Sequence, residues 1–334
     1  MDGLDLPKLQ AFLDAEVGGI GRLHAELICG GRSNLTYRLT DGRSDWVLRR
    51  PPLGELTPSA HDMGREFRVV AALRDSGVPV ARAVVHCEDP SVIGVPFAVV
   101  EHVAGQVLRT RSDLDGLSDA DVRRCGFALV DTLADLHAVD PSAVGLAEFG
   151  RVGGYLRRQV RRWYDQWGRV ATREVPDVET LHARLAETCP EDSGSAIVHG
   201  DFRVDNAILD ADDVGVVRAV VDWEMATLGD PLADLALHVV YRDPAFDAVL
   251  GGAAASTSDR MPDADAIVAR YAARSGRDGG SLSFALALGY FKVAVIAEGI
   301  HARFEAGHTV GEGFERVGEA VEHLAAAGLR AGSV

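Results

Sequence analysis

The segment between residues 197 and 224 constrains the fold of this chain most strongly, because short apolar runs alternate there with polar positions at fixed spacing. Residues 207–209 and 216–221 are mostly apolar, and turn-forming residues lie between them. Two apolar runs joined by a turn predict an antiparallel hairpin, in which the first residue lies beside the last. We therefore expect Asn206 and Asp222 to lie at the same end of the hairpin.

These two polar residues, together with a carboxylate that precedes them, suit phosphoryl transfer. The amide oxygen of Asn206 and the carboxylate of Asp222 are hard oxygen ligands, which Mg²⁺ accepts when phosphates complete its shell. Asp201 lies five residues before Asn206 on the loop that leads into the hairpin, where it is placed to accept a hydroxyl proton. A base Asp, an Asn five residues later and a metal-binding Asp across a hairpin form the arrangement of kinases.

The composition limits the classes of partner. The chain has 334 residues, a length typical of two lobes, and a net charge of −16, which disfavours nucleic acid and anionic membranes as partners. The four cysteines are far apart and form no Cys-x-x-Cys pair, and the N-terminus lacks the pattern of a signal peptide, so we expect a cytoplasmic protein. Lys292 and Glu298 interrupt the longest apolar run, which favours a buried helix over a membrane span.

The coarse pattern along the chain predicts an α+β protein in two parts. Residues 1–104 read as strands around one helix, which begins after Thr57-Pro58 and contains Met63 and Leu73 on its apolar face. Residues 105–334 are mostly helical, and a capping box at 118–121 opens a long helix.

The motifs resemble those of the aminoglycoside phosphotransferase and choline kinase superfamily. The resemblance covers nearly the whole chain and rests on His199-Gly200-Asp201-Phe202-Arg203-x-x-Asn206, Asp222-Trp223-Glu224 and Gly229-Asp230-Pro231-x-x-Asp234. It implies a bilobal protein-kinase-like fold with a small β-rich N-terminal lobe and a larger, mostly helical C-terminal lobe. It also implies an enzyme that transfers the γ-phosphate of ATP or GTP, with Mg²⁺, to an alcohol group of a small molecule.

The same resemblance implies two nucleotide-contacting segments in the N-terminal lobe. Gly31, Ser33 and Asn34 fall where the family has a loop that covers the nucleotide, although a plain hairpin turn accounts for these residues equally well. Glu101 and Val103 follow an apolar strand and resemble the hinge, where backbone groups bind adenine.

Arg49 falls where kinases have a lysine that holds the α- and β-phosphates. The chain contains only two lysines, Lys8 and Lys292, so no lysine lies near this position and no Walker A loop is present. The guanidinium group of arginine binds phosphate in a bidentate manner and can take this role. Glu66 is the candidate ion-pair partner of Arg49, with a solvated helix position as the alternative, and strand alternation turns Arg50 to the opposite face.

The substrate is indicated less directly. The segments 46–52 and 94–97 look like the kinase-like domain that is fused to acyl-CoA dehydrogenases, which implies a hydroxylated acyl thioester, such as a hydroxyacyl-CoA, as the acceptor. Arg158, Arg162 and Trp163 lie on one cationic helix, which is either an anchor for an anionic substrate group or simply a solvated face.

Three alternatives stay open. An aminoglycoside-type antibiotic phosphotransferase shares the motifs, although its pocket should be lined with carboxylates. A nucleotide-binding pseudokinase that regulates a partner is disfavoured because Asp201, Asn206 and Asp222 are all present. A metallohydrolase that uses His199 with Asp201 and Asp222 lacks the additional histidine ligands of such sites.

Overall fold

The computed structural model describes residues 3–29, 34–53, 62–277, 282–308 and 313–332. The chain divides into two compact units, Met1–Ala104 with Arg218–Glu224, and Gly105–Val217 with Met225–Val334. The segment Arg218–Glu224, which the sequence places in the second part, belongs by its contacts to the first unit. The Val220 N–H, for example, donates to the carbonyl oxygen of Pro79 at 2.8 Å.

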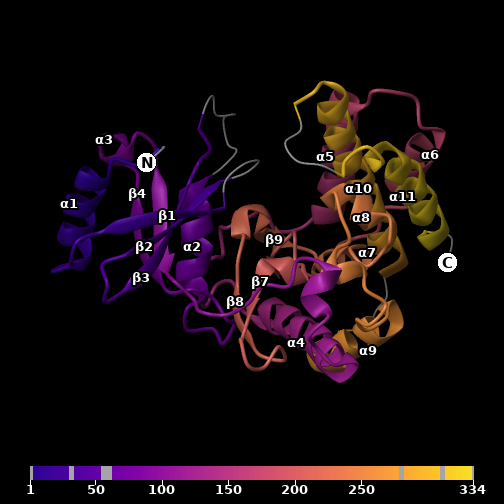
Figure 1. Cartoon of the computed structure of the whole chain (residues 1–334). Helices are drawn as coiled ribbons and strands as arrows, with labels where there is room; N and C mark the ends of the chain where they lie inside the picture. The colour runs from indigo at the N-terminus through magenta and orange to yellow at the C-terminus, as the bar shows by residue number, and fades with distance from the viewer. Residues whose placement is uncertain (1–2, 30–33, 54–61, 278–281, 309–312, 333–334) are drawn as a thin grey trace. The chain divides into compact units, whose positions relative to one another are not determined.

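A five-stranded antiparallel sheet forms the first unit, with the order β1-β2-β3-β5-β4. Its strands are β1 (His24–Cys29), β2 (Leu35–Thr40), β3 (Asp45–Arg50), β4 (Ala83–Cys87) and β5 (Phe97–Glu101). Trp46 and Leu48 are buried on one face of β3, so Arg49 projects from the other face. Helix α2 (Met63–Leu73) packs against β4 and β5 (Figure 1).

The helices of the first unit differ from the expectation of one helix. Helix α1 (Leu6–Val17) and the short α3 (Pro90–Ile93) are also present. Asp5 caps α1 by accepting the N–H of Lys8 at 3.2 Å, and Pro7 occupies the first turn. Asp62 caps α2 in the same way; the predicted start at Thr57-Pro58 lies outside the described residues.

The second unit is mainly helical. In chain order its helices are α4 (Asp119–Ala138), α5 (Tyr155–Val170), α6 (Pro176–Glu187), α7 (Pro231–Val240), α8 (Phe246–Leu250), α9 (Ala264–Ser275), α10 (Leu282–Glu305) and α11 (Val317–Ala331). The predicted start of α4 is confirmed, because the Ser118 hydroxyl caps the helix by accepting the N–H of Asp121 at 3.1 Å. The predicted class, a β-rich first part and a larger helical second part, is confirmed.

Short strands carry the polar motif. Strands β6 (Ala196–Val198) and β9 (Thr227–Gly229) pair antiparallel. Strand β7 (Ala207–Leu209) leads into a turn that the Asp210 N–H closes onto the carbonyl oxygen of Val216 at 2.9 Å, and β8 (Val217–Val220) follows. The strand–turn–strand sequence predicted for this segment is therefore present.

Helix α10 is long and apolar enough, by length and composition, to cross a membrane, with 24 residues and a hydropathy of 1.5 in its most apolar window. In this structure 67% of that window is buried, and the helix packs against α5, α6, α7 and α11 (Figure 1). The burial agrees with the core helix that Lys292 and Glu298 predict.

Candidate active site

The loop that follows β6 carries His199, Gly200 and Asp201. Gly200 has a φ of 81°, and a Cβ atom there would lie 2.8 Å from the carbonyl oxygen of Met225. Only glycine adopts this conformation in this space without strain. Gly200 therefore permits the tight turn that places Asp201 at the end of the strand.

Charged side chains from two helices hold the peptide groups around Gly200. Asp234 on α7 accepts the N–H groups of His199 at 2.7 Å and of Gly200 at 2.9 Å. Lys292 on α10 donates to the carbonyl oxygen of Gly200 at 2.6 Å. Nδ1 of His199 accepts the N–H of Asp201 at 3.2 Å, which gives this histidine a structural role.

The carboxylate of Asp201 has partners on both oxygens. Tyr241 donates its hydroxyl to Oδ1 at 2.5 Å, and Asn206 donates its amide nitrogen to Oδ2 at 3.1 Å. Burial raises the pKa of Asp201, but the charges of Arg203 and Lys292 outweigh burial and hold the pKa below its ordinary value. Asp201 is therefore ionised at neutral pH, and at 27% side-chain exposure it remains within reach of a substrate.

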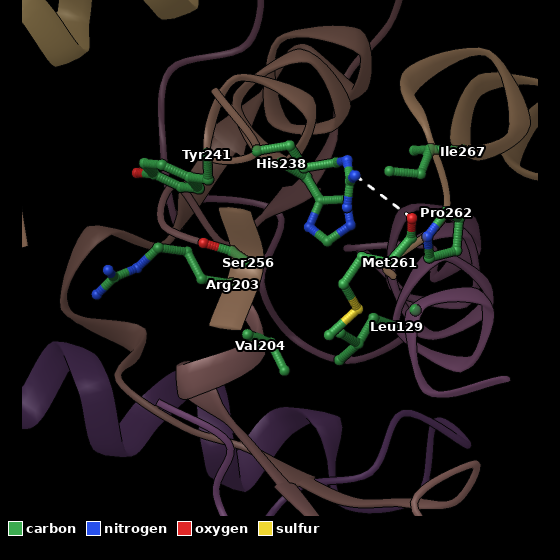
Figure 2. A pocket seen from close by; sticks show the side chains of 11 residues that line it. Leu129, Arg203, Val204, His238, Tyr241, Ser256, Met261, Pro262 and Ile267 are labelled. Carbon is green, nitrogen blue, oxygen red and sulfur yellow. Dashed lines mark hydrogen bonds between the residues drawn. The ribbon is translucent and has the colours of Figure 1, made fainter. Parts of the chain in front are cut away.

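Arg203 lies beside this carboxylate, with Nε 3.4 Å from Oδ1 of Asp201, and its guanidinium lies over the ring of Tyr241. Figure 2 shows Arg203 and Tyr241 on one side of a small cavity. The rest of the lining includes Leu129, Val204, Met261, Pro262 and Ile267. The cavity volume of about 20 Å³ suits about one water molecule.

The predicted metal ligands, Asn206 and Asp222, belong to different compact units. Asn206 directs its amide nitrogen at Asp201, so its amide oxygen is the atom that suits a cation. Asp222 has a φ of 64° and is the one non-glycine residue with positive φ in the described part of the chain. Such backbone strain clusters at functional sites. Both side chains offer the oxygen chemistry of a Mg²⁺ site, and their joint role stays a prediction.

Arg49 projects from the sheet of the first unit and contacts two carboxylates. It donates through Nη1 to Oε1 of Glu66 on α2, and through Nη2 to Oδ1 of Asp222 at 3.0 Å. Burial lowers the pKa of Arg49, but the two carboxylates outweigh burial and raise the pKa above its ordinary value. The predicted ion pair between Arg49 and Glu66 is therefore present. Arg50 is buried on the other face and donates to backbone carbonyl groups, as strand alternation predicted.

The predicted nucleotide-covering loop is described only at its end. Gly31 and Ser33 lie outside the described residues, so their role stays a prediction. Asn34 is 3% exposed at the start of β2.

The predicted hinge uses part of its backbone internally. The side chain of Glu101 pairs with Arg82 at 2.9 Å. The N–H of Glu101 donates to the carbonyl oxygen of Arg82 at 2.8 Å, and the N–H of His102 donates to that of Asp45 at 3.0 Å. The N–H groups of Glu101 and His102 are therefore already used within the protein, and a nucleotide contact at Val103 stays a prediction.

The three predicted substrate contacts on α5 differ in their surroundings. Arg158 donates to the carbonyl oxygens of Arg151, at 2.8 Å, and Gly153, and so ties down the loop before the helix. Trp163 is 8% exposed and belongs to the core. Arg162 is exposed, with its guanidinium 5.6 Å from the centroid of the Trp163 ring. Of the three residues, Arg162 is the one placed to meet a solute.

Sequence reasoning missed two residues of the second unit, Tyr241 and Lys292. Tyr241 follows α7, forty residues beyond Asp201, and no local pattern marks it. Lys292 did carry a signal, because a lone cation within an apolar run needs a buried partner. That partner is the carbonyl oxygen of Gly200, which the linear sequence does not indicate.

The sheet, the helical unit and the His-Gly-Asp loop are those of kinase-like phosphotransferases. The sequence profile of the family described as "Phosphotransferase enzyme family" matches residues 24–267. The chain belongs to this family.

Two curated relatives carry the name acyl-CoA dehydrogenase. Family member 11 of Rattus norvegicus is 34% identical over 336 residues, and family member 10 of Mus musculus is 34% identical over 299 residues. The alignments cover 98% and 88% of this chain, but only 43% and 28% of the relatives. The chain thus spans less than half the length of these relatives, and the predicted resemblance to their kinase-like region is confirmed.

Solved structures share the fold. A Ralstonia eutropha JMP134 protein, provisionally named an aminoglycoside phosphotransferase, is 31% identical with a TM-score of 0.83 over 98% of both chains. A thermostable mutant of aminoglycoside phosphotransferase APH(4)-Ia, in complex with AMP-PNP and hygromycin B, is 18% identical, with a TM-score of 0.64 over 98% of this chain and 99% of that one. The GDP complex of aminoglycoside 2′-phosphotransferase-IIIa is 15% identical, with a TM-score of 0.63 over 96% and 99%.

Proposed function

We propose that this phosphotransferase moves the γ-phosphate of ATP or GTP onto a hydroxyl group of a small molecule, with Asp201 as the base. The observation that carries the proposal is the Asp201 carboxylate, which is ionised, half-buried and held by Tyr241 and Asn206 at the end of the Gly200 turn. A base that is fixed in this way orients a hydroxyl group and accepts its proton as the phosphoryl group arrives.

The chain's own residues supply positioning and charge. Tyr241 and Asn206 fix the direction of the carboxylate, and the charge of Arg203 favours its ionised form. In a phosphoryl transfer of this kind, orientation and electrostatic stabilisation provide most of the rate enhancement.

On the nucleotide side, Arg49 is the proposed phosphate ligand. Its Nε atom is buried and has no partner among the described residues, and a phosphate oxygen would supply the missing acceptor. Glu66 fixes the guanidinium from α2. Asn206 and Asp222 would hold Mg²⁺ through their side-chain oxygens, and the bound ion would neutralise phosphate charge.

For the acceptor, we favour a hydroxylated acyl-CoA over an aminoglycoside. The names of the curated relatives associate this kind of chain with acyl-CoA chemistry. The exposed Arg162 suits an anionic group on the acceptor and not a polycation.

A screen tests this proposal directly. Hydroxylated acyl-CoAs, amino alcohols and aminoglycosides are each incubated with Mg·ATP or Mg·GTP, and phosphorylated product is measured by mass spectrometry. We expect product from a hydroxyacyl-CoA. Product from aminoglycosides alone would replace the proposed acceptor class, and nucleotide binding without any product would favour the pseudokinase alternative.

The metallohydrolase alternative has less support. In the described stretches of the chain, no group of three or more His, Cys, Asp or Glu side chains is arranged to hold a metal. Nδ1 of His199 already accepts the N–H of Asp201. Nucleotide-independent hydrolysis would be the sign of this alternative.

A further inference from the structure

Lys292 is one of two lysines in a chain whose other 32 cationic side chains are arginines, because Lys and Arg together number 34. It projects from the middle of α10, between apolar neighbours that belong to the core of the second unit. Its Nζ atom donates to the carbonyl oxygen of Gly200 at 2.6 Å and lies 5.4 Å from the centroid of the Trp163 ring. Burial of an ammonium group among apolar side chains costs free energy. The contact between Lys292 and the loop therefore requires an explanation.

The contact completes a clamp of two opposite charges on one glycine turn. Asp234 accepts the N–H groups of His199 and Gly200, while Lys292 donates to the carbonyl oxygen of Gly200. That carbonyl belongs to the peptide bond that leads into Asp201. The two helices α7 and α10 therefore set both ends of the Gly200 residue, and with them the orientation of the Asp201 backbone.

Four charged groups from the loop, α7 and α5 act on the ammonium group. Asp201 of the loop and Asp234 of α7 are negative; Arg203 of the loop and Arg162 of α5 are positive. A small cavity of about 30 Å³ separates Lys292 from Tyr155 and Gln159 of α5, and gives room for a slightly larger side chain.

We propose that Lys292 is a positioning residue for phosphoryl transfer, which acts through the Gly200 carbonyl to hold Asp201 in its working orientation and which releases that hold when it loses its proton. The inference rests on the proposed function, because it assigns Lys292 a task in the same reaction. A neutral amine donates more weakly to the carbonyl oxygen and brings no charge to the loop.

The surroundings of Lys292 bring its proton loss into a pH range in which activity can be measured. Burial lowers the pKa of Lys292 to about 8, although Asp201 and Asp234 oppose this effect. Turnover should therefore fall as the pH rises through about 8.

Unfolding through this group cannot cause that fall. The pKa of Lys292 is lower in the folded chain, so between about 8 and about 10.4 the unfolded chain binds a proton that the native chain lacks. Stability therefore rises with pH across this window, as far as Lys292 is concerned. A loss of activity without a loss of thermal stability would be the signature of the released clamp.

The first test reads Lys292 without an activity assay. Protein that carries ¹³C at the ε-carbon of lysine gives two lysine signals, and Lys8→Met assigns them. Lys8 lies on the surface with a side-chain exposure of 62%. We expect the Lys292 signal to titrate at about pH 8, well below the ordinary value for lysine of about 10.4. A Lys292 signal that titrates at the ordinary lysine value would overturn the inference, whether or not a substrate is known.

The second test separates positioning from folding. Lys292→Met should lower kcat about 10- to 100-fold at neutral pH, leave the affinity for Mg·ATP nearly unchanged and abolish the alkaline fall. Lys292→Arg keeps the charge, so it should recover most of the turnover and remain active well above the wild-type limit. Lys8→Met is the matched control and should behave as the wild type.

Each outcome decides. A Lys292→Met variant with the turnover and pH profile of the wild type would overturn the inference, as would an Arg variant that keeps the alkaline fall. A wild-type protein that binds nucleotide but phosphorylates no acceptor overturns the proposed function and the catalytic role of Lys292, whereas the lysine titration still decides whether the clamp exists.

Discussion

The carboxylate of Asp201 depends on a side chain forty residues away, the hydroxyl group of Tyr241. Tyr241 is 4% exposed, and burial followed by the charge of Asp201 raises its pKa well above the ordinary value. Tyr241 therefore stays protonated at neutral pH and donates its hydroxyl group to Asp201. This donor favours the ionised form of Asp201 and fixes one of its oxygens.

The first prediction concerns Tyr241→Phe, which keeps the ring and removes the donor. In the wild type, the pKa of Asp201 is below its ordinary value. The carboxylate form, and the stability linked to it, is therefore lost only as the pH falls through that lowered pKa. Without the donor we expect the acid limb of kcat to move to higher pH. Tyr164→Phe removes a tyrosine–carboxylate bond elsewhere in the same unit, to Glu179, and should leave the profile unchanged.

The second prediction concerns Arg49. Arg49→Ala should raise the nucleotide KM strongly, because it leaves Glu66 unpaired beside the phosphates. Arg49→Lys should raise the nucleotide KM less than Arg49→Ala does, but should not restore the wild-type value. A single ammonium group cannot replace the two guanidinium nitrogens that contact Glu66 and Asp222. Steady-state kinetics with varied nucleotide compares the variants, and an unchanged KM in Arg49→Ala would remove Arg49 from the phosphate site.

Arg50→Ala is the control for Arg49, and the structure gives it a second readout. Arg50 lies on the opposite face of β3, so the nucleotide KM should stay near the wild-type value. It is 4% exposed and donates to two carbonyl groups, so we expect a loss of stability of about 1–3 kcal/mol in urea unfolding. A raised KM without this loss would mean that the faces are misassigned.

For single residues, the sequence predicted site residues that lie close together along the chain. Asp201 and Asn206 lie five residues apart, and their contact follows from that spacing. The ion pair of Arg49 and Glu66 followed from the resemblance to kinases. Tyr241 could not be predicted, because the end of α7 reaches the loop only through the packing of the second unit.

At the scale of elements, α10 shows how a core helix tolerates charge. Glu298 is fully buried and accepts the N–H and hydroxyl groups of Thr172 at 2.9 and 2.7 Å. Its second oxygen lies 3.3 Å from the guanidinium of Arg173. Lys292 and Glu298 thus connect α10 to two other segments of its unit, and both contacts depend on charge.

The third prediction follows for Glu298→Gln. The amide retains the shape but loses the charge that pairs with Arg173, so we expect a loss of about 2–4 kcal/mol in the free energy of unfolding. Glu305→Gln, at the exposed end of the same helix, is the matched control and should change stability by less than about 0.5 kcal/mol. Equal urea midpoints for the two variants would contradict the structural role of Glu298.

Elements with strong end signals were predictable from the sequence, and others were not. Ser118 marked the start of α4, and the turn between β7 and β8 followed from its composition. Helix α1 was not predicted, although Asp5 and Pro7 mark its start. Its burial comes from packing against the sheet core, which no local pattern displays.

At the scale of the whole molecule, the residues proposed for the nucleotide, the metal and the acceptor are divided between the two compact units. Most of the first unit is continuous in sequence, but Arg218–Glu224 joins it from the second half of the chain. Asp222 therefore belongs with Arg49, while Asn206 belongs with Asp201. The spacing of the motifs predicted Asn206 and Asp222 as metal ligands. The compact unit to which each residue belongs follows only from three-dimensional contacts.

The fourth prediction orders the two metal ligands. Asp222→Ala should weaken the binding of Mg·ATP more than Asn206→Ala does, because a carboxylate offers the ion a charge and an amide offers a dipole. Titration calorimetry in the presence and absence of Mg²⁺ measures both variants. Equal affinities in the two variants would mean that these residues do not share a metal.

The most direct measurement of the central claim is phosphorylation of the best acceptor by the wild type and by Asp201→Asn, with nucleotide binding measured in parallel. Asparagine keeps the shape of the side chain but cannot accept the hydroxyl proton. We expect a fall in kcat of about 10²–10⁴-fold with the affinity for Mg·ATP largely retained. A variant that keeps more than about half of the wild-type kcat would contradict the role of Asp201 as the base.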